Sequence, residues 1–259
     1  MVVEGIKVHR FIANFLKYRY LLIELVKKNI KIKYRRSVLG IFWSLMEPLL
    51  FMIVLTIIFS TLFKSDIANY PIYLLTGRLA FTFFSDGSSQ SMDSILINRG
   101  TIKKLYVPKY IFTLSVVLSS LVTYLLSLIV LFAVMIATTT PFTTFMFLAV
   151  VPTVLLLIFT IGVGLILATY TVFFRDIKHL YGVFLTLLLY ASAIFFPADI
   201  IPAQFQIFLQ INPLFVYIEM LRDAFLYATW FDPIQLIYGT IVAIVSLVIG
   251  IIVLYKNQD

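Results

Sequence analysis

The sequence predicts an all-α integral membrane protein. We expect six transmembrane helices, an N-terminal amphipathic helix at the membrane interface, and short re-entrant helices on the outer side between the last two spans. Two observations carry this prediction, namely the composition and the distribution of basic residues. Of the 259 residues, 62% are hydrophobic and only 12% are charged, whereas soluble domains carry about 25% charged residues. Lipid must therefore be part of the solvent around this chain.

The predicted spans follow from the length of the apolar stretches. A membrane helix needs about 20 mostly apolar residues. Five stretches meet this requirement readily, and a sixth is weaker because it carries Arg78 and Asp86. It is counted because an odd number of spans would conflict with the charge distribution. The predicted spans are 39–63, 70–92, 110–137, 142–174, 180–196 and 233–255. They form one domain over residues 1–259, in which 1–38 is cytoplasmic and interfacial.

Basic residues collect on one side of these spans. Ten of them precede the first span, and further groups follow the second and fourth spans. The opposite side holds only Lys64 and Arg222. The positive-inside rule therefore places both termini in the cytoplasm. It also explains the net charge of +8 as a topology signal, so we expect no nucleic-acid partner.

The segment before the first span has the pattern of an interfacial helix. One half of its helical wheel is apolar: Leu22, Ile23, Leu25, Val26, Ile30 and Ile32. The other half is charged: Glu24, Lys27, Lys28, Lys31 and Arg35. Such a helix lies in the membrane interface. It anchors the chain on anionic lipid, and it is also placed to touch a cytoplasmic partner; the two roles are compatible. We expect the N-terminal residues not to act as a signal peptide, because no uninterrupted apolar region follows the first charges.

The stretch from 197 to 232 is apolar but interrupted. Pro202, Pro213 and seven polar or charged residues make it unsuitable as a lipid-facing span. We expect short helices that enter the outer leaflet and return, surrounded by protein or water. Asp232 followed by Pro233 predicts an N-cap and a first helical position at the start of the last span.

Several kinds of chemistry are not expected. The sequence has no glycine-rich phosphate loop of the Walker type and no cysteine. Gly162 and Gly164 lie within an apolar span, where they indicate close helix packing. His9 and His179 have no second ligand at metal spacing. We therefore expect no catalytic site, no metal site and no cofactor on this chain.

Six segments of the sequence carry motifs that can be compared with known families: 31–43, Glu47-Pro48-Leu49-Leu50, 70–77, 172–180, Ile211-Asn212-Pro213-Leu214 and Leu221-Arg222-Asp223. Together they resemble the membrane subunit of ABC-2 type exporters for polysaccharides and polyol phosphates. The matches occur in order over nearly the whole chain. The chain departs from the family after Gly77, where Arg78 and Phe81 replace an apolar residue and a nearby tryptophan.

The resemblance implies a permease subunit and no enzyme. Exporters of this family carry O-antigen, capsule-like glycans or teichoic acid through the bacterial cytoplasmic membrane. The implied assembly is a homodimer with two copies of a separate ATPase, which binds ATP and Mg²⁺. The pore would lie between the two permease copies, and the substrate would be a lipid-linked glycan.

Two groups of residues on the cytoplasmic side are candidates for a role. One group would contact the ATPase, and the other is a charged pair in a cytoplasmic loop. The candidates for coupling are Ser94, Asn98, Arg99, Lys103 and Lys104, with Lys27, Lys28 and Lys31 on the interfacial helix. We expect 94–98 to form a short helix; a plain positive-inside loop is the alternative. Arg175 and Asp176 form either a local ion pair that fixes the turn or a contact for the N-terminal helix.

Ionisable and aromatic residues inside the membrane are candidates for the pore, because buried charges in a membrane usually mark function or an internal partner. The candidates are Glu47, Arg78, Phe196, Phe205, Tyr217, Glu219, Arg222 and Tyr227. Arg78 either snorkels outward or faces the pore, with Asp86 as an alternative partner. For each single aromatic residue, ordinary packing is the alternative.

Two other functions fit the sequence less well. An ABC-2 permease for a drug or a simple lipid would have a similar topology. An ion-coupled transporter or a membrane enzyme usually has several acidic or histidine residues at mid-membrane, and this chain has few. A co-purifying ATPase would separate the last class from the exporters.

Overall fold

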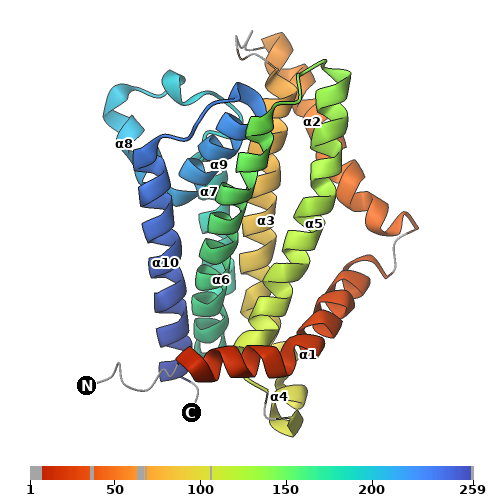
Figure 1. Cartoon of the computed structure of the whole chain (residues 1–259), viewed down its shortest axis with the longest axis vertical. Helices are drawn as coiled ribbons and strands as arrows, with labels where there is room; N and C mark the ends of the chain where they lie inside the picture. The colour runs from red at the N-terminus through yellow and green to blue at the C-terminus, as the bar shows by residue number, and fades with distance from the viewer. Residues whose placement is uncertain (1–7, 36–37, 63–66, 68, 106, 258–259) are drawn as a thin grey trace.

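The computed structural model describes residues 8–35, 38–62, 67, 69–105 and 107–257. Every regular element in this part of the chain is helical. The long helices α3 (Tyr70–Ile97), α5 (Tyr110–Ala137), α6 (Val150–Phe173) and α10 (Pro233–Lys256) run side by side along the long axis (Figure 1). Four helical segments there are long and apolar enough to cross a membrane: Gly40–Phe59, Tyr110–Ala137, Thr144–Phe173 and Pro233–Lys256.

Helix α1 (Val8–Tyr34) crosses the foot of the bundle and then climbs beside α5 (Figure 1). Leu22 and Leu25 are buried against the bundle, and the Asn29 amide donates a hydrogen bond to the Ser115 hydroxyl (3.3 Å). Lys27, Lys28 and Lys31 are exposed. Helix α1 therefore has leucines buried against the bundle and lysines exposed; its place in the membrane interface stays a prediction. The last turn of α10 lies at the same end of the bundle, which we call the α1 end.

The first predicted span begins four residues later than expected. A short 3₁₀ turn, η1 (Gly40–Phe42), precedes α2 (Trp43–Leu62). Gly40 has a φ of +54°, a conformation that glycine adopts without strain, so the chain changes direction between α1 and α2. The Ser127 hydroxyl on α5 donates to the carbonyl of Ser44 (2.9 Å) and holds this start of α2 in place.

Helices α3 and α7 (Ile177–Tyr190) lie at predicted spans but are not among the four apolar segments. Helix α3 is long enough to cross a membrane but carries Arg78, Asp86 and Asp93. Helix α7 has 14 residues, about 21 Å of length, against a hydrocarbon core of about 30 Å. The predicted fifth span, 180–196, is therefore placed too late, since the helix ends at Tyr190.

The segment from 197 to 232 consists of short elements at the end opposite to α1. They are η3 (Ala198–Ile200), α8 (Ala203–Ile211), α9 (Pro213–Arg222) and the π-helical turn η4 (Asp223–Tyr227). Asn212 caps α9 by accepting from the amide of Leu214 (3.1 Å). The Asp232 side chain accepts from the amide of Ile234 (2.9 Å), which confirms the predicted N-cap of α10. We call the end of the bundle that carries these short elements the α8 end.

Close contact between α6 and α10 depends on glycine. A Cβ on Gly162 would lie 2.4 Å from the carbonyl carbon of Ser246, and one on Gly250 would lie 2.6 Å from the carbonyl oxygen of Gly162. Small residues at such crossings let helix backbones approach in a membrane. The predicted packing role of Gly162 is therefore confirmed.

Candidate functional site: a polar stripe along α3

Helix α3 carries a continuous polar face. Between positions 78 and 93, every residue that is not buried has a polar side chain. These residues form the polar stripe: Arg78, Thr82, Ser85, Asp86, Ser89, Gln90 and Asp93. The opposite face of α3 is buried against α5 and α6. The stripe covers 15 helical steps, or about 22 Å, which is most of the thickness of a hydrocarbon core.

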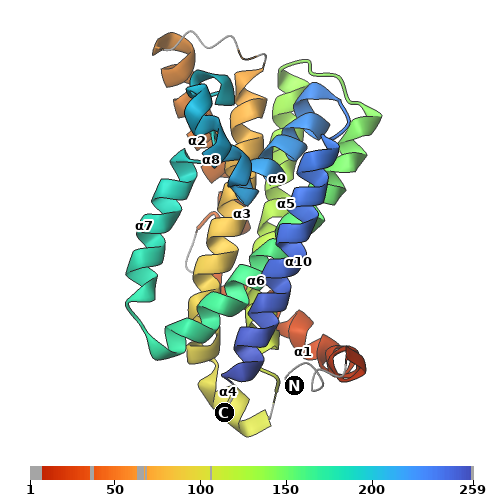
Figure 2. The same cartoon turned by 90° about the vertical axis from the view of Figure 1, so that its left-hand side faces the viewer.

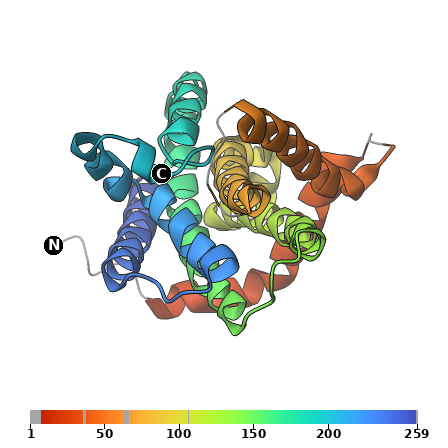
Figure 3. The same ribbon diagram turned by 90° about the horizontal axis from the view of Figure 1, so that it is seen from above.

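Helices α2 and α7 lie on either side of this stripe. Both contact α3, and Figure 3 shows them on the same side of the bundle with α3 between them. Helix α7 stands apart from the rest of the bundle (Figure 2). Within one chain, the side chains of the polar stripe are partly exposed, and that of Gln90 is exposed.

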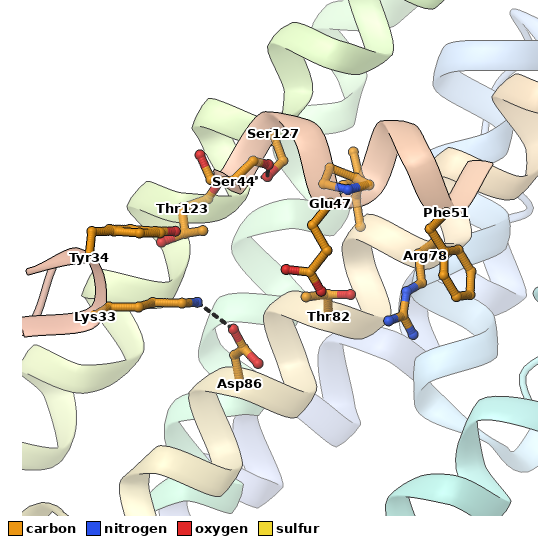
Figure 4. Close-up of a pocket in the computed structure, with 12 residues that line it drawn as sticks. Lys33, Tyr34, Ser44, Glu47, Phe51, Arg78, Thr82, Asp86, Thr123 and Ser127 are labelled. Carbon is orange, nitrogen blue, oxygen red and sulfur yellow. Dashed lines mark hydrogen bonds and ion pairs between the residues drawn. The ribbon is translucent and has the colours of Figure 1, made fainter. Parts of the chain in front are cut away.

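The part of the stripe that contains Arg78, Thr82 and Asp86 forms one wall of a cleft of about 210 Å³. The other walls come from the end of α1, the start of α2 and α5, and its lining includes Lys33, Glu47, Arg78 and Asp86. Glu47 points from α2 toward α3, between the Lys33–Asp86 pair and Arg78 (Figure 4). Two acids and two bases thus meet at one place in the bundle, from three different helices.

Lys33 and Asp86 form an ion pair in this cleft. Their nitrogen and oxygen atoms are 2.8 Å apart, and the side chains are 37% and 33% exposed. Burial lowers the pKa of Lys33, but the charge and the hydrogen bond of Asp86 more than offset this and raise the pKa above its usual value. Lys33 therefore remains a cation at neutral pH. Asp86 pairs with Lys33 and not with Arg78, for which it was one of the possible partners.

Arg78 and Glu47 are less constrained than this pair. The Arg78 guanidinium lies over the ring of Phe51, 4.3 Å from its centroid. In the described part of the chain, neither Arg78 nor Glu47 forms an ion pair within 4.0 Å. Both groups line the cleft, so their hydrogen-bonding atoms are available to a molecule that enters it.

A second ion pair lies at the other end of the stripe. Lys178, in the first turn of α7, pairs with Asp93 on α3. Both side chains remain partly exposed, at 37% and 42%. This pair joins α7 to α3 near the α1 end, and the buried Tyr181 hydroxyl joins the same helices by donating to the Ser88 hydroxyl (2.7 Å). Sequence reasoning missed Lys33 and Lys178 as partners of the α3 acids, because each lies more than 50 residues away.

Arg222 lies inside the protein. Its guanidinium is fully buried and lies 3.4 Å from the centre of the Tyr73 ring. It contacts Glu219 at 2.5 Å and donates to the carbonyl of Ala193 (3.0 Å). The Tyr73 hydroxyl donates to the carbonyls of Ala193 and Phe196. Arg222 and Tyr73 thus fasten the chain after α7 to the first turns of α3.

The other predicted pore residues are distributed over the α8 end. Tyr217 is fully buried and donates to the carbonyl of Gly239 (2.7 Å). Glu219 is 25% exposed beside Arg222. Phe205 and Tyr227 are about half exposed, and Phe196 is partly buried. The structure brings Glu47 and Arg78 together in the cleft, but it does not gather these aromatic side chains into one wall.

The predicted coupling residues lie at the α1 end, with one change of boundary. The short helix expected over 94–98 is wrong: these residues complete α3, because Ser94 is buried and bonds to Thr113 (3.0 Å). The Asn98 amide donates back to the Ser94 carbonyl. The short helix is α4 (Arg99–Leu105), which projects below the bundle (Figure 1). Arg99 and Lys104 are exposed on it; the side chain of Lys103 lies outside the described residues.

Arg175 and Asp176 are exposed at the turn between α6 and α7. Among the described residues they form no ion pair with each other. The backbone of Asp176 begins α7, since its carbonyl accepts from the amide of His179 (3.0 Å). The residue that fastens this turn to α3 is the neighbouring Lys178.

The sequence matches that of a known family and of individual transport proteins. The ABC-2 type transporter family matches over residues 20–226. The chain is 29% identical to the O-antigen export system permease protein RfbA of Klebsiella pneumoniae, over 91% of each chain. It is 30% identical to the protein of that name from Myxococcus xanthus, over 79% of this chain and 80% of the other. It is 27% identical to the polysialic acid transport protein KpsM of Escherichia coli, over 90% and 91%.

The family match extends from the middle of α1 to η4 and includes the whole polar stripe. The relatives are aligned over nearly their full lengths. Together with the apolar helices, these matches identify an integral membrane protein. The chain belongs to the ABC-2 type transporter membrane family.

Proposed function

We propose that this chain is the permease subunit of an ATP-driven exporter that moves a lipid-linked polysaccharide, of O-antigen or teichoic-acid type, across the bacterial plasma membrane. The observation that carries the proposal is the polar stripe. A polar face of about 22 Å is unfavourable against lipid, because unpaired polar groups are costly in hydrocarbon. It suits a path filled with water or with the hydroxyl groups of a glycan.

The proposed assembly is a homodimer with the pore between the two copies. Helices α2 and α7 expose large apolar side chains beside the stripe, including Val54, Ile57, Val183 and Leu187. A second copy placed there would cover these side chains and the partly exposed side chains of the stripe. In this arrangement α2, α3, α5, α6, α7 and α10 are six spans with both ends in the cytoplasm, and α8, α9 and η4 form the outer re-entrant region.

The proposed energy source is a separate ATPase, present in two copies, which binds ATP and Mg²⁺. Helix α4 is the proposed contact, because Arg99 and Lys104 project from the α1 end and are exposed. The exposed Lys27, Lys28 and Lys31 on α1 lie at the same end. Basic side chains there would pair with acidic groups on the ATPase.

Reversing two charges on α4 is expected to uncouple transport. In Arg99→Glu/Lys104→Glu, repulsion replaces attraction at the ATPase contact, so export should fall at least tenfold while the permease remains folded. Surface glycan and ATPase activity of the purified complex are the measurements. Lys256→Glu, an exposed charge at the same end on α10, is the matched control and should export normally. Unchanged export and ATPase activity in the double variant would contradict the role of α4.

The proposed function itself is tested by lipid mass spectrometry after depletion of the protein in its native cell. A lipid-linked glycan should accumulate, because its synthesis continues while its export stops. The accumulated species would also identify the substrate. A normal glycolipid pool with intact surface polysaccharide would contradict the proposal and favour a permease for a drug or a simple lipid.

A further inference from the structure

The charges along the polar stripe are balanced. Among the described residues, the stripe and the groups that line the cleft or pair with it from α1, α2 and α7 contribute three bases and three acids. The bases are Lys33, Arg78 and Lys178, and the acids are Glu47, Asp86 and Asp93. Two of the three bases are already paired with acids. The stripe therefore offers no surplus of positive charge to a polyanion.

The α8 end is acidic. Between residues 191 and 233, the sequence contains four acids, Asp199, Glu219, Asp223 and Asp232, and a single base, Arg222. Arg222 is buried and paired with Glu219, whereas Asp199 and Asp232 are exposed. Like charges brought together are repulsive, and such juxtaposition excludes unsuitable ligands. A polyanion that leaves past residues 191–233 would meet exposed acids, whereas the single base of this segment is buried.

From this charge pattern we infer that the glycan carried along the stripe is uncharged over most of its length. The inference rests on the proposed function and narrows it. It favours a neutral O-antigen type glycan and disfavours polyanions such as polysialic acid or a polyol phosphate. The departure at Arg78 does not alter this, because Glu47 lies in the same cleft and balances its charge.

The cleft also provides a subsite for one sugar ring. Glu47 offers carboxylate oxygens as acceptors, and Arg78 and Thr82 offer donors; all three line the cleft and point into the same space (Figure 4). Hydrogen bonds from hydroxyl groups to an ionised acceptor are stronger than neutral ones. The volume of about 210 Å³ is below the usual range of about 300–1,000 Å³ for drug-sized ligands. It therefore suits one ring of a longer chain.

The test uses the full chain in nanodiscs of zwitterionic lipid and saturation-transfer NMR. The probes are two neutral pentasaccharides, mannopentaose and maltopentaose, and the anionic α2,8-linked pentasialic acid. At least one neutral probe should bind, and pentasialic acid should bind at least tenfold more weakly. Glu47→Gln should weaken the neutral probe about tenfold, through loss of a charge-assisted hydrogen bond. Glu24→Gln, a carboxylate on the exposed face of α1, is the control and should bind normally.

Reversing the charge at Glu47 should increase the affinity of the cleft for the anionic probe. Glu47→Lys removes a negative charge from the cleft and adds a positive one, so pentasialic acid should bind more tightly to this variant than to the native chain. If the native chain binds pentasialic acid as tightly as the neutral probes, the inference is overturned and glycan export still stands. If no probe binds, the subsite is overturned, and lipid accumulation after depletion remains the separate test of export.

Discussion

Replacing Gly162 by leucine is expected to abolish folding of the bundle. The new side chain would begin at a Cβ only 2.4 Å from the Ser246 carbonyl carbon, so α6 and α10 would have to separate. Overpacking usually costs about 1–3 kcal/mol and occasionally more. Here the contact is between backbones, which have no rotamer to change. The amount of monodisperse protein extracted from membranes, and its thermal unfolding in detergent, should both fall sharply.

A pair of alanine variants supplies the control. Alanine is a better helix former than glycine by about 1 kcal/mol, so Gly182→Ala on α7 should be neutral or stabilising, because nothing lies within 4 Å of its added Cβ. Gly162→Ala should instead destabilise the protein. Equal shifts of the unfolding temperature in the two variants would contradict the close α6–α10 contact.

Replacing Arg222 by methionine is expected to have a similarly large effect. Methionine removes the partner of Glu219, whose side chain is 25% exposed, and one of the two donors to the carbonyl of Ala193, which keeps the Tyr73 hydroxyl. Removal of one member of a buried ion pair typically costs about 3–5 kcal/mol. Arg222→Lys should also be destabilising, because an ammonium cannot reproduce the planar stacking on Tyr73 together with several directed hydrogen bonds. Unfolding in increasing SDS concentration measures the loss.

Arg78→Met is the matched control for this prediction. Arg78 is only partly buried and rests on the ring of Phe51, a contact worth about 0.5–1 kcal/mol at an exposed site. The folded protein should therefore survive this change. If Arg78→Met and Arg222→Met lose the same stability, then Arg222 does not anchor the segment after α7 as described.

The sequence was sufficient for the parts of the fold that depend on local chemistry. The helix before the first span follows from apolar and charged residues at helical spacing; Leu22 and Leu25 of its apolar half are buried, whereas Ile23 and Ile32 are exposed. The cap at Asp232 follows from one residue type next to proline. The packing role of Gly162 follows from the position of this glycine in an apolar span. Each of these features is determined by residues within one or two helical turns.

The missed features depend on contacts between distant segments. Lys33 reaches Asp86, and Arg222 reaches Ala193, across elements whose relative position the sequence does not define. The polar stripe could have been predicted from the sequence, because its members follow helical spacing between 78 and 93. In the sequence, Arg78 and Asp86 weaken the prediction of a span over 70–92, whereas in the structure they belong to one face of a long helix. Whether Phe205, Tyr227 and the α4 lysines act on substrate or ATPase stays a prediction.

The most direct test of the central claim is the accessibility of the polar stripe to water. The chain has no cysteine, so single cysteines can be introduced without background. A water-soluble, charged methanethiosulfonate reacts with thiolates, which form where water is present. Thr82→Cys, Ser85→Cys and Ser89→Cys should be labelled in native membranes. Ile241→Cys, Val245→Cys and Val248→Cys, on the exposed apolar face of α10, should remain unlabelled. Equal labelling of the two sets, or no labelling of the stripe, would contradict a hydrated path along α3.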